Sequence, residues 1–404
     1  MHVFNSLKVR WFALLWSGQS FSRVGDSLYR LALSWWVLEK TGSATIMGTV
    51  MILSFTPMLI FLLIGGVAVD RVSRTRLMLA SDVLRGVVVL IVATLAYTKM
   101  LEIWHVYAAS IFFGFVEAFF QPAYTALVPD ILPKETLPSA NSLTSISGQM
   151  AGVIGPALGA LIVSGGGTPL AFALDGISFF ISAGFLLPLV FNIKEKHISA
   201  EKKNNVIQDF REGLRIVLSI PWLWISIALF SLSNITLSGP LNIALPFFVK
   251  DVLLKDVKVL GWMYSALSIG ALFGAIYLGR MKHIRHRGWI AYGSFLVTGL
   301  SIFILGFFTT TIPALLSILI GGLCISLFGM IWTNTLQEMV PNKMLGRVSS
   351  IDLLGSFALL PIGFGIIGLI TDRNGPGNVF ILCGAISMGL ALLGLSQSSI
   401  RKLD

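Results

Sequence analysis

The sequence is poor in charge and in cysteine. Asp, Glu, Lys and Arg make up only 12% of its 404 residues, whereas 55% are hydrophobic and the mean hydropathy is +0.85. This balance excludes a soluble globular protein. Both cysteines, Cys324 and Cys383, fall inside apolar runs without C-x-x-C spacing. We therefore expect two buried core thiols rather than a disulfide or a metal pair.

Other absences narrow the classes of function. The five histidines form no cluster with carboxylates or a nucleophile, so a membrane-embedded enzyme acting on lipid is only a remote alternative. No G-x-x-x-x-G-K-S/T motif is present, and we do not expect ATP-driven pumping by this chain. The net charge of +10 comes from bases in short loops. They do not form a folded basic domain, so we expect no nucleic-acid partner. We also expect no cofactor and no metal.

Apolar runs of about 20 residues recur along the whole chain, and each could cross about 30 Å of hydrocarbon as a helix. The runs are continuous rather than alternating, which excludes a β-barrel. We count about twelve spans and expect an all-α integral membrane protein. The expected spans are residues 11–37, 45–69, 77–98, 105–128, 141–163, 170–191, 222–249, 259–278, 289–308, 312–339, 348–370 and 379–395.

Residues 192–220 form the only sizeable hydrophilic stretch, and they divide the chain into six-helix bundles at residues 1–191 and 221–404. Apolar residues recur at helical spacing from Ile207 to Val217, which predicts an amphipathic helix at the cytoplasmic interface that tethers the halves. If the N-terminus is cytoplasmic, most lysines and arginines fall on that side. We therefore expect a multi-pass protein of a bacterial-type inner membrane, with both termini in the cytoplasm.

A short basic loop joins the second and third spans. It reads Gly66-Val-Ala-Val-Asp70-Arg71-Val-Ser-Arg74-Thr-Arg76. The positive-inside rule explains the arginines but not an Asp placed four residues after a Gly. This pattern resembles the loop between helices two and three of the major facilitator superfamily, although Ser73 replaces the usual Gly and Thr75 a base. The resemblance implies a transporter of two pseudo-symmetric six-helix bundles, with its substrate site between the halves.

The resemblance also assigns a gating role to Gly66, Asp70, Arg71 and Arg74. We expect Asp70 to accept hydrogen bonds from a helix start near Gly346-Arg347 and so to latch the cytoplasmic side.

Asp82 and Arg85 lie three residues apart early in the third span. We expect them to pair with each other or with the loop of Asp70, in a structural or gating role.

Ionisable groups inside a membrane are costly and usually face a cavity or a partner. Gln19, Arg23, Asp26 and Arg30 recur three or four residues apart and share one face of the first span. They could form a self-neutralised stripe packed against other helices. Alternatively they line an aqueous cavity, where Asp26 is a candidate for proton coupling, or belong to an external gate.

Glu117 lies near the middle of the fourth span, with Gln121 one turn further on and no basic residue within reach on the same helix. A carboxyl in this setting is a candidate proton carrier. The alternative is a neutral Glu117 that is hydrogen-bonded to a neighbour.

Polar residues also mark the seventh and tenth spans. Ser231, Asn234 and Ser238 share a face of the seventh span, where they could bind substrate or hold helices together. Trp332 lies near the cytoplasmic end of the tenth. In the major facilitator superfamily the first, fourth, seventh and tenth spans line the central cavity. The resemblance therefore implies that Gln19, Arg23, Arg30, Gln121, Ser231, Asn234, Ser238 and Trp332 are candidates for contact with substrate.

The chain also resembles the macrolide-efflux-like branch of drug–proton antiporters. The similar segments include Leu15-Trp16-Ser-Gly18-Gln19, Thr41-Gly42-Ser43-Ala44 and Gln121-Pro122-Ala123. In the fifth span, Gly152-x-x-Gly155-Pro156-x-x-Gly159 partly matches the antiporter motif, with Ala160 in place of its last Gly. Glycines at these positions would let helices approach closely and rock against each other.

This second resemblance implies a monomer in the lipid bilayer that exports a bulky amphipathic small molecule, drug or macrolide-like, in exchange for protons by alternating access. The branch also contains exporters of siderophores and movers of lysolipid, so these substrates stay open. A proton-coupled importer is a further alternative, because Glu117 fits either direction of coupling.

Overall fold

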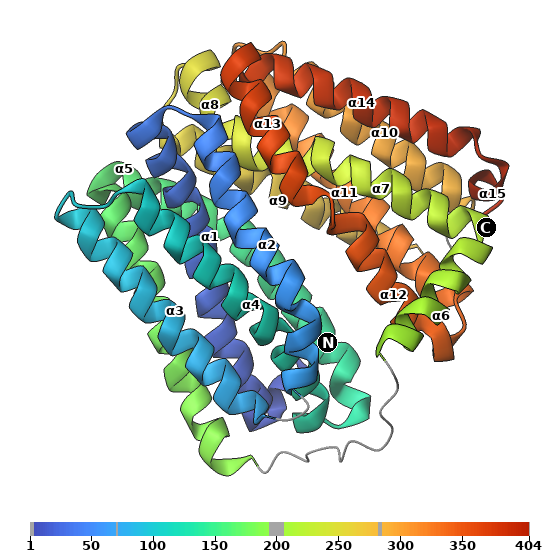
Figure 1. Cartoon of the computed structure of the whole chain (residues 1–404), viewed down its shortest axis with the longest axis horizontal. Coiled ribbons are helices and arrows are strands. Elements are labelled where there is room, and N and C mark those ends of the chain that lie inside the picture. Colours follow the sequence, from blue (N-terminus) through green and yellow to red (C-terminus); the bar gives the residue numbers. More distant parts are fainter. Residues whose placement is uncertain (1–3, 70–71, 194–205, 282–284, 404) are drawn as a thin grey trace. The chain divides into compact units, whose positions relative to one another are not determined.

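The computed structural model describes residues 4–69, 72–193, 206–281 and 285–403, apart from the side chains of residues 63–68, 206–210 and 342–343. Every regular element within these ranges is a helix (Figure 1). The helices pack as two compact units. The first comprises the described residues within 1–42 and 49–201, and the second those within 43–48 and 202–404.

Five long helices and two short 3-10 turns come first along the chain. They are η1 (Asn5–Lys8), α1 (Arg10–Thr41), α2 (Ala44–Val69), α3 (Arg74–Tyr97), α4 (Ile103–Ile131), η2 (Lys134–Thr136) and α5 (Leu137–Asn192). Helix α5 is broken at Gly167, where φ is 76° and ψ is 173°. Glycine adopts this conformation without a steric penalty, so α5 contains two crossings rather than one. The break falls between the expected fifth and sixth spans.

The second unit is built from the later helices. They are α6 (Val206–Ser219), α7 (Pro221–Gly239), η3 (Pro240–Ala244), α8 (Leu245–Phe247), η4 (Phe248–Val252), α9 (Val257–Gly279), α10 (Arg287–Leu305), α11 (Thr311–Met339), α12 (Asn342–Phe357), α13 (Leu360–Asn374), α14 (Pro376–Ser396) and α15 (Ser398–Arg401). Elements α7 to η4 form one apolar crossing, and α12 with α13 forms another. Both cysteines are buried free thiols in this unit.

Ten segments of the described residues are long and apolar enough to cross a membrane as helices. One of them, Lys134–Asn192, holds the two crossings separated by Gly167. Helix α1 is not among the ten, although its 32 residues are long enough, because its polar face lowers its hydropathy. With α1 included, the expectation of about twelve transmembrane helices is confirmed.

Close contact between α1 and α5 organises the first unit. A Cβ added at Gly155 would overlap the Cβ of Ser27, and one at Gly159 would lie 3.2 Å from a methyl carbon of Leu28. On α1, a Cβ added at Gly18 would lie 2.9 Å from the Cβ of Phe185. Small residues let membrane helices approach to backbone distance. Gly155 and Gly159 of the antiporter-like motif therefore serve the α1–α5 contact; Gly152 and Pro156 lie on the same stretch of α5.

The amphipathic helix expected in the hydrophilic stretch is present as α6, and it packs against α12. Val217 is buried in a cluster with Val348 and Ile351. At the edge of this contact Arg347 donates to Glu212 over 2.9 Å. Helix α6 is thus anchored within the second unit, whereas the role of residues 192–220 as a tether stays a prediction.

The first turn of α2 belongs to the second unit, because Ser43–Gly48 pack there. The carboxylate of Asp372 on α13 accepts hydrogen bonds from the backbone N–H groups of Ala44 (2.6 Å) and Thr45 (2.9 Å) and from the hydroxyl of Ser43 (2.8 Å). An anion that accepts from free N–H groups at a helix start stabilises that start. Asp372 therefore caps α2.

Candidate functional site

A polar cavity lies in the first unit between α1, α3 and α4. Its lining joins the stripes that the sequence predicts on the first and fourth spans. The lining residues are Gln19, Ser22, Arg23, Asp26, Arg85, Glu117, Phe120, Gln121 and Tyr124. Of the candidates on these two spans, only Arg30 is outside this lining; its side chain is exposed.

Arg85 is the centre of the charges around this cavity. Its Nη2 lies 2.7 Å from Oδ1 of Asp82, and its Nη1 lies 3.3 Å from Oε2 of Glu117. The guanidinium also lies over the rings of Phe120 at 4.3 Å and Phe179 at 4.7 Å. Arg85 is only 4% exposed, so these ionic and cation–π contacts act in a medium of low dielectric. The sequence left open whether Arg85 pairs with Asp82 or with the loop of Asp70. The structure contains the pair with Asp82.

Asp82 is also hydrogen-bonded to neutral side chains. Ser182 on α5 donates to its Oδ2 over 2.7 Å. Gln19 on α1 donates from Nε2 to the same oxygen at 3.4 Å and to the hydroxyl of Ser182 at 2.9 Å. Gln19 is 5% exposed. This network joins α1, α3 and α5 behind the cavity wall and fixes the position of Arg85.

Glu117 has no basic neighbour on its own helix, as expected, but it has one on another helix of the folded unit. Arg85 reaches it from α3, and Gln121 donates to its other oxygen, Oε1, over 2.8 Å. The sequence of one span cannot predict a partner on a neighbouring helix. The side chain of Glu117 nevertheless remains 31% exposed. It is therefore a carboxyl that is both paired with a cation and open to the cavity.

The polar face of α1 makes different contacts from those expected within that helix. Arg23 donates to the backbone oxygen of Thr144 on α5 over 2.8 Å and lies over the ring of Tyr124 at 5.7 Å. Asp26 lines the cavity. Among the described residues it forms no ion pair with Arg23 or Arg30. The α1 stripe is thus not neutralised by pairing along its own helix.

The polar residues of the second unit mainly join helices. Asn234 on α7 donates to the backbone oxygen of Ser356 on α12 over 2.9 Å. The indole N–H of Trp332 donates to Oδ2 of Asp352 over 3.1 Å, and its ring packs edge-on against Phe230 at 4.7 Å. These contacts are of the kind expected if the stripe holds helices together. Ser231 is buried, and the backbone oxygen of Ser238 accepts from Asn242 over 2.8 Å.

The basic loop is only partly within the described residues. Asp70 and Arg71 lie outside them, and Gly66 falls in the part of α2 whose side-chain surroundings are not described. Arg74, at the start of α3, is buried, forms an ion pair with Asp130 and donates to the backbone oxygen of Ala126 over 3.1 Å. Arg74 therefore joins the beginning of α3 to the end of α4, a contact that the motif alone does not predict.

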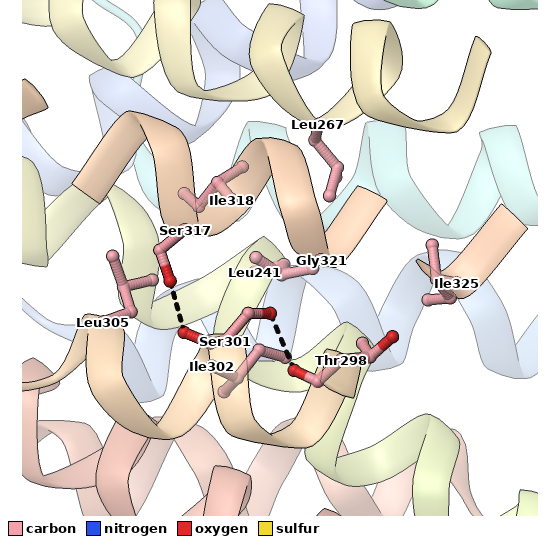
Figure 2. A pocket seen from close by; sticks show the side chains of 10 residues that line it. All are labelled: Leu241, Leu267, Thr298, Ser301, Ile302, Leu305, Ser317, Ile318, Gly321 and Ile325. Atoms are coloured by element: carbon pink, nitrogen blue, oxygen red, sulfur yellow. Dashed lines mark hydrogen bonds between the residues drawn. The ribbon is translucent and has the colours of Figure 1, made fainter. Parts of the chain in front are cut away.

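A second cavity, in the second unit, has a different character (Figure 2). Its wall comes from η3, α9, α10 and α11, and no charged side chain lines it. Its hydroxyls are satisfied by the backbone: Ser317 donates to the oxygen of Ser301 at 2.6 Å, and Ser301 to that of Thr298 at 2.8 Å. None of the predicted site residues takes part, so we regard this cavity as a packing space between helices.

The sequence profile of the Major Facilitator Superfamily matches residues 15–359 and 234–399. The chain belongs to this superfamily. It is therefore a multi-pass membrane transporter of small molecules and not an enzyme. A solved POT family transporter in complex with 5-aminolevulinic acid has the same fold, with a TM-score of 0.74, 13% identity and 97% of each chain covered.

Curated relatives of this superfamily member are efflux proteins and exporters. It is 25% identical over 408 residues to macrolide efflux protein A of Streptococcus pyogenes, with both chains fully covered. It is 26% identical to the multidrug efflux pump Tap of Mycolicibacterium fortuitum, covering 97% of this chain and 96% of that one. Its identity to the enterobactin exporter EntS of Salmonella typhi is 24%, covering 95% and 90%.

Proposed function

We propose that this transporter exports a bulky amphipathic small molecule in exchange for protons by alternating access. The observation that carries the proposal is the position of Glu117, which is paired with Arg85 and yet 31% exposed in a polar cavity. A carboxyl inside the membrane that is open to a polar cavity has a route for proton exchange, and its protonation would break the ion pair with Arg85.

Protonation of Glu117 removes the negative charge that faces Arg85. Arg85 then keeps Asp82 at 2.7 Å, so the cation is not left unpaired. Deprotonation restores the second ion pair and makes the cavity more polar. A proton and an amphipathic molecule can thereby compete for the cavity, and this competition gives exchange. Asp26, which lines the same cavity, is the second candidate for coupling.

The cavity wall also favours an amphipathic substrate. Phe120 and Tyr124 present aromatic rings beside Gln121 and the charged groups. Most of the lining is polar, so these two rings would contact the apolar part of an amphipathic molecule and the polar residues its polar part. The names of the macrolide and multidrug efflux relatives support a drug-like substrate, and that of the enterobactin exporter supports a siderophore. Lysolipid export and proton-coupled import remain the alternatives.

We propose that the loop of Gly66, Asp70, Arg71 and Arg74 latches the cytoplasmic side, that both termini are cytoplasmic, and that the transporter works as a monomer in a bacterial inner membrane. The Arg74–Asp130 ion pair supports this proposal, because it holds the beginning of α3 in place beside the loop.

Everted membrane vesicles that contain the protein provide the test. After acidification of the lumen, a fluorescent cationic amphiphile should accumulate inside, and its addition should release protons from the lumen. Vesicles without the protein are the control. Accumulation that persists after a protonophore collapses the gradient would contradict proton exchange, and proton-driven movement out of the vesicles would favour the importer.

A further inference from the structure

Asp175, on the second crossing of α5, is a carboxyl that the polar cavity does not include. Its side chain is 0% exposed. The hydroxyl of Ser178 donates to the backbone oxygen of Asp175 over 2.8 Å and lies 3.4 Å from Oδ1. Among the described residues Oδ2 has no hydrogen-bond partner, although it is buried. The carboxyl is therefore enclosed with almost no polar contact.

The backbone of α1 covers this carboxyl at Gly25. A Cβ added at Gly25 would lie 2.5 Å from Oδ1 of Asp175 and would overlap the hydroxyl of Ser178. Only glycine permits this approach. The next residue, Asp26, lines the polar cavity. Asp175 thus lies against α1 at the residue before Asp26, at a place where that helix has no side chain.

Among the described residues Asp175 forms no ion pair. The groups that act on it electrostatically are Asp26, Tyr29 and Arg30 on α1 and Arg85 on α3. Arg85 already contacts two other carboxylates, and Arg30 is exposed. In this part of the first unit the four carboxyls Asp26, Asp82, Glu117 and Asp175 outnumber the three guanidiniums Arg23, Arg30 and Arg85. One bound proton makes this group neutral.

A buried carboxylate without a partner loses its hydration and gains nothing in return, so the neutral acid is the favoured form. We propose that Asp175 is a proton-binding site of this transporter. It holds a proton in this conformation and exchanges it with the polar cavity by way of Asp26 on the adjoining turn of α1. The inference rests on the proposed proton-coupled function, which it extends from Glu117 and Asp26 to a third carboxyl.

Infrared spectroscopy of the full chain in lipid nanodiscs tests the site without any need for transport. A protonated carboxylic acid gives a C=O stretching band that a carboxylate lacks. We expect this band at neutral pH, its loss in Asp175→Asn, and its disappearance from the wild type as the pH is raised. Ser178→Ala is the matched control and should keep the band, because the hydroxyl donates to the backbone instead.

Two results would overturn the inference. If Asp175→Asn leaves the band unchanged, Asp175 is ionised in the wild type. If the band is lost in Asp175→Asn but does not titrate in the wild type, the acid is static and takes no part in exchange. Should Asp175→Asn fail to fold, isotope-labelled aspartate separates an aspartate band from a glutamate band, and a titrating aspartate band that persists in Asp26→Asn supports the site.

The outcome is distinguishable from failure of the proposed function. An absent aspartate band overturns the Asp175 site while export coupled through Glu117 still stands. A titrating band in a protein that shows no gradient-driven transport overturns the proposed function while the proton site stands.

Discussion

Arg85 on α3 and Glu117 on α4 form an ion pair of 3.3 Å that joins two helices. The same guanidinium holds Asp82 at 2.7 Å. Loss of charge at Glu117 therefore leaves Arg85 paired, and under the proposed function the Arg85–Glu117 ion pair opens and closes as a proton binds and leaves.

Replacement of Arg85 should destabilise the first unit. Arg85→Gln leaves Asp82 buried without its cation, and removal of one partner of a buried pair costs about 3–5 kcal/mol in the free energy of unfolding. The double variant Asp82→Asn/Arg85→Gln removes both charges and should recover most of this loss. Thermal unfolding in detergent measures both effects. If the single variant is as stable as the wild type, Arg85 is not the centre of the charge network.

The close approach of α5 to α1 should depend on Gly155. Gly155→Ala places a methyl group where Ser27 already lies, and overpacking of this kind costs about 1–3 kcal/mol. Gly184→Ala on the same helix is the matched control, because a Cβ there meets no atom within 4 Å of the described structure. We expect Gly155→Ala to lower the stability and Gly184→Ala to raise it, since alanine favours a helix by about 0.5–1 kcal/mol where space allows. Equal melting temperatures for the two variants would argue against the α1–α5 contact.

Asn234 distinguishes the two interpretations of the seventh-span stripe. Asn234→Leu keeps the approximate volume and removes the donor to the Ser356 oxygen. If the stripe holds helices together, the free energy of unfolding should fall by about 1 kcal/mol while substrate affinity stays unchanged. Binding and thermal unfolding should be measured on the same preparation. Loss of binding with unchanged stability would place Asn234 in the substrate site instead.

The cap on α2 predicts a graded response at position 372. Asp372→Ala removes the acceptor for the N–H groups of Ala44 and Thr45 and should cost about 0.5–2 kcal/mol of stability. Asp372→Asn retains an oxygen acceptor and should cost less, because it loses only the interaction of the charge with the helix start. Thermal unfolding in detergent shows which of the two variants is less stable. If alanine is tolerated as well as asparagine, the cap contributes nothing.

Properties that depend on one segment at a time could be predicted from the sequence. The spans were placed to within a few residues because a membrane helix needs only a local run of apolar side chains. The pairing of Asp82 with Arg85 followed from their spacing of one helical turn. The antiporter-like motif also predicted helix contact, and Gly155 makes one.

Contacts between distant segments could not be predicted in the same way. Arg85 reaches Glu117 from another helix, Asp130 pairs with Arg74, and Asp372 caps a helix that begins more than three hundred residues earlier. Hydropathy and spacing carry no information on which helices are neighbours. In the same way, only the fold places Asp175 against Gly25.

Transport by Glu117→Gln in proteoliposomes tests the central claim most directly. Glutamine has the shape of the protonated acid and cannot release a proton. The variant should therefore bind a fluorescent cationic amphiphile and exchange it across the membrane at equal concentrations. It should not concentrate the amphiphile when a proton gradient is imposed. Glu135→Gln, at an exposed position in η2, is the matched control and should behave as the wild type.

The decisive quantity is the ratio of amphiphile inside to outside at steady state under the gradient. The wild type and Glu135→Gln should reach a ratio well above one, and Glu117→Gln should stay at one while its exchange rate is retained. A ratio in Glu117→Gln equal to that of the wild type would contradict proton coupling through the Arg85–Glu117 pair and transfer the role to Asp26.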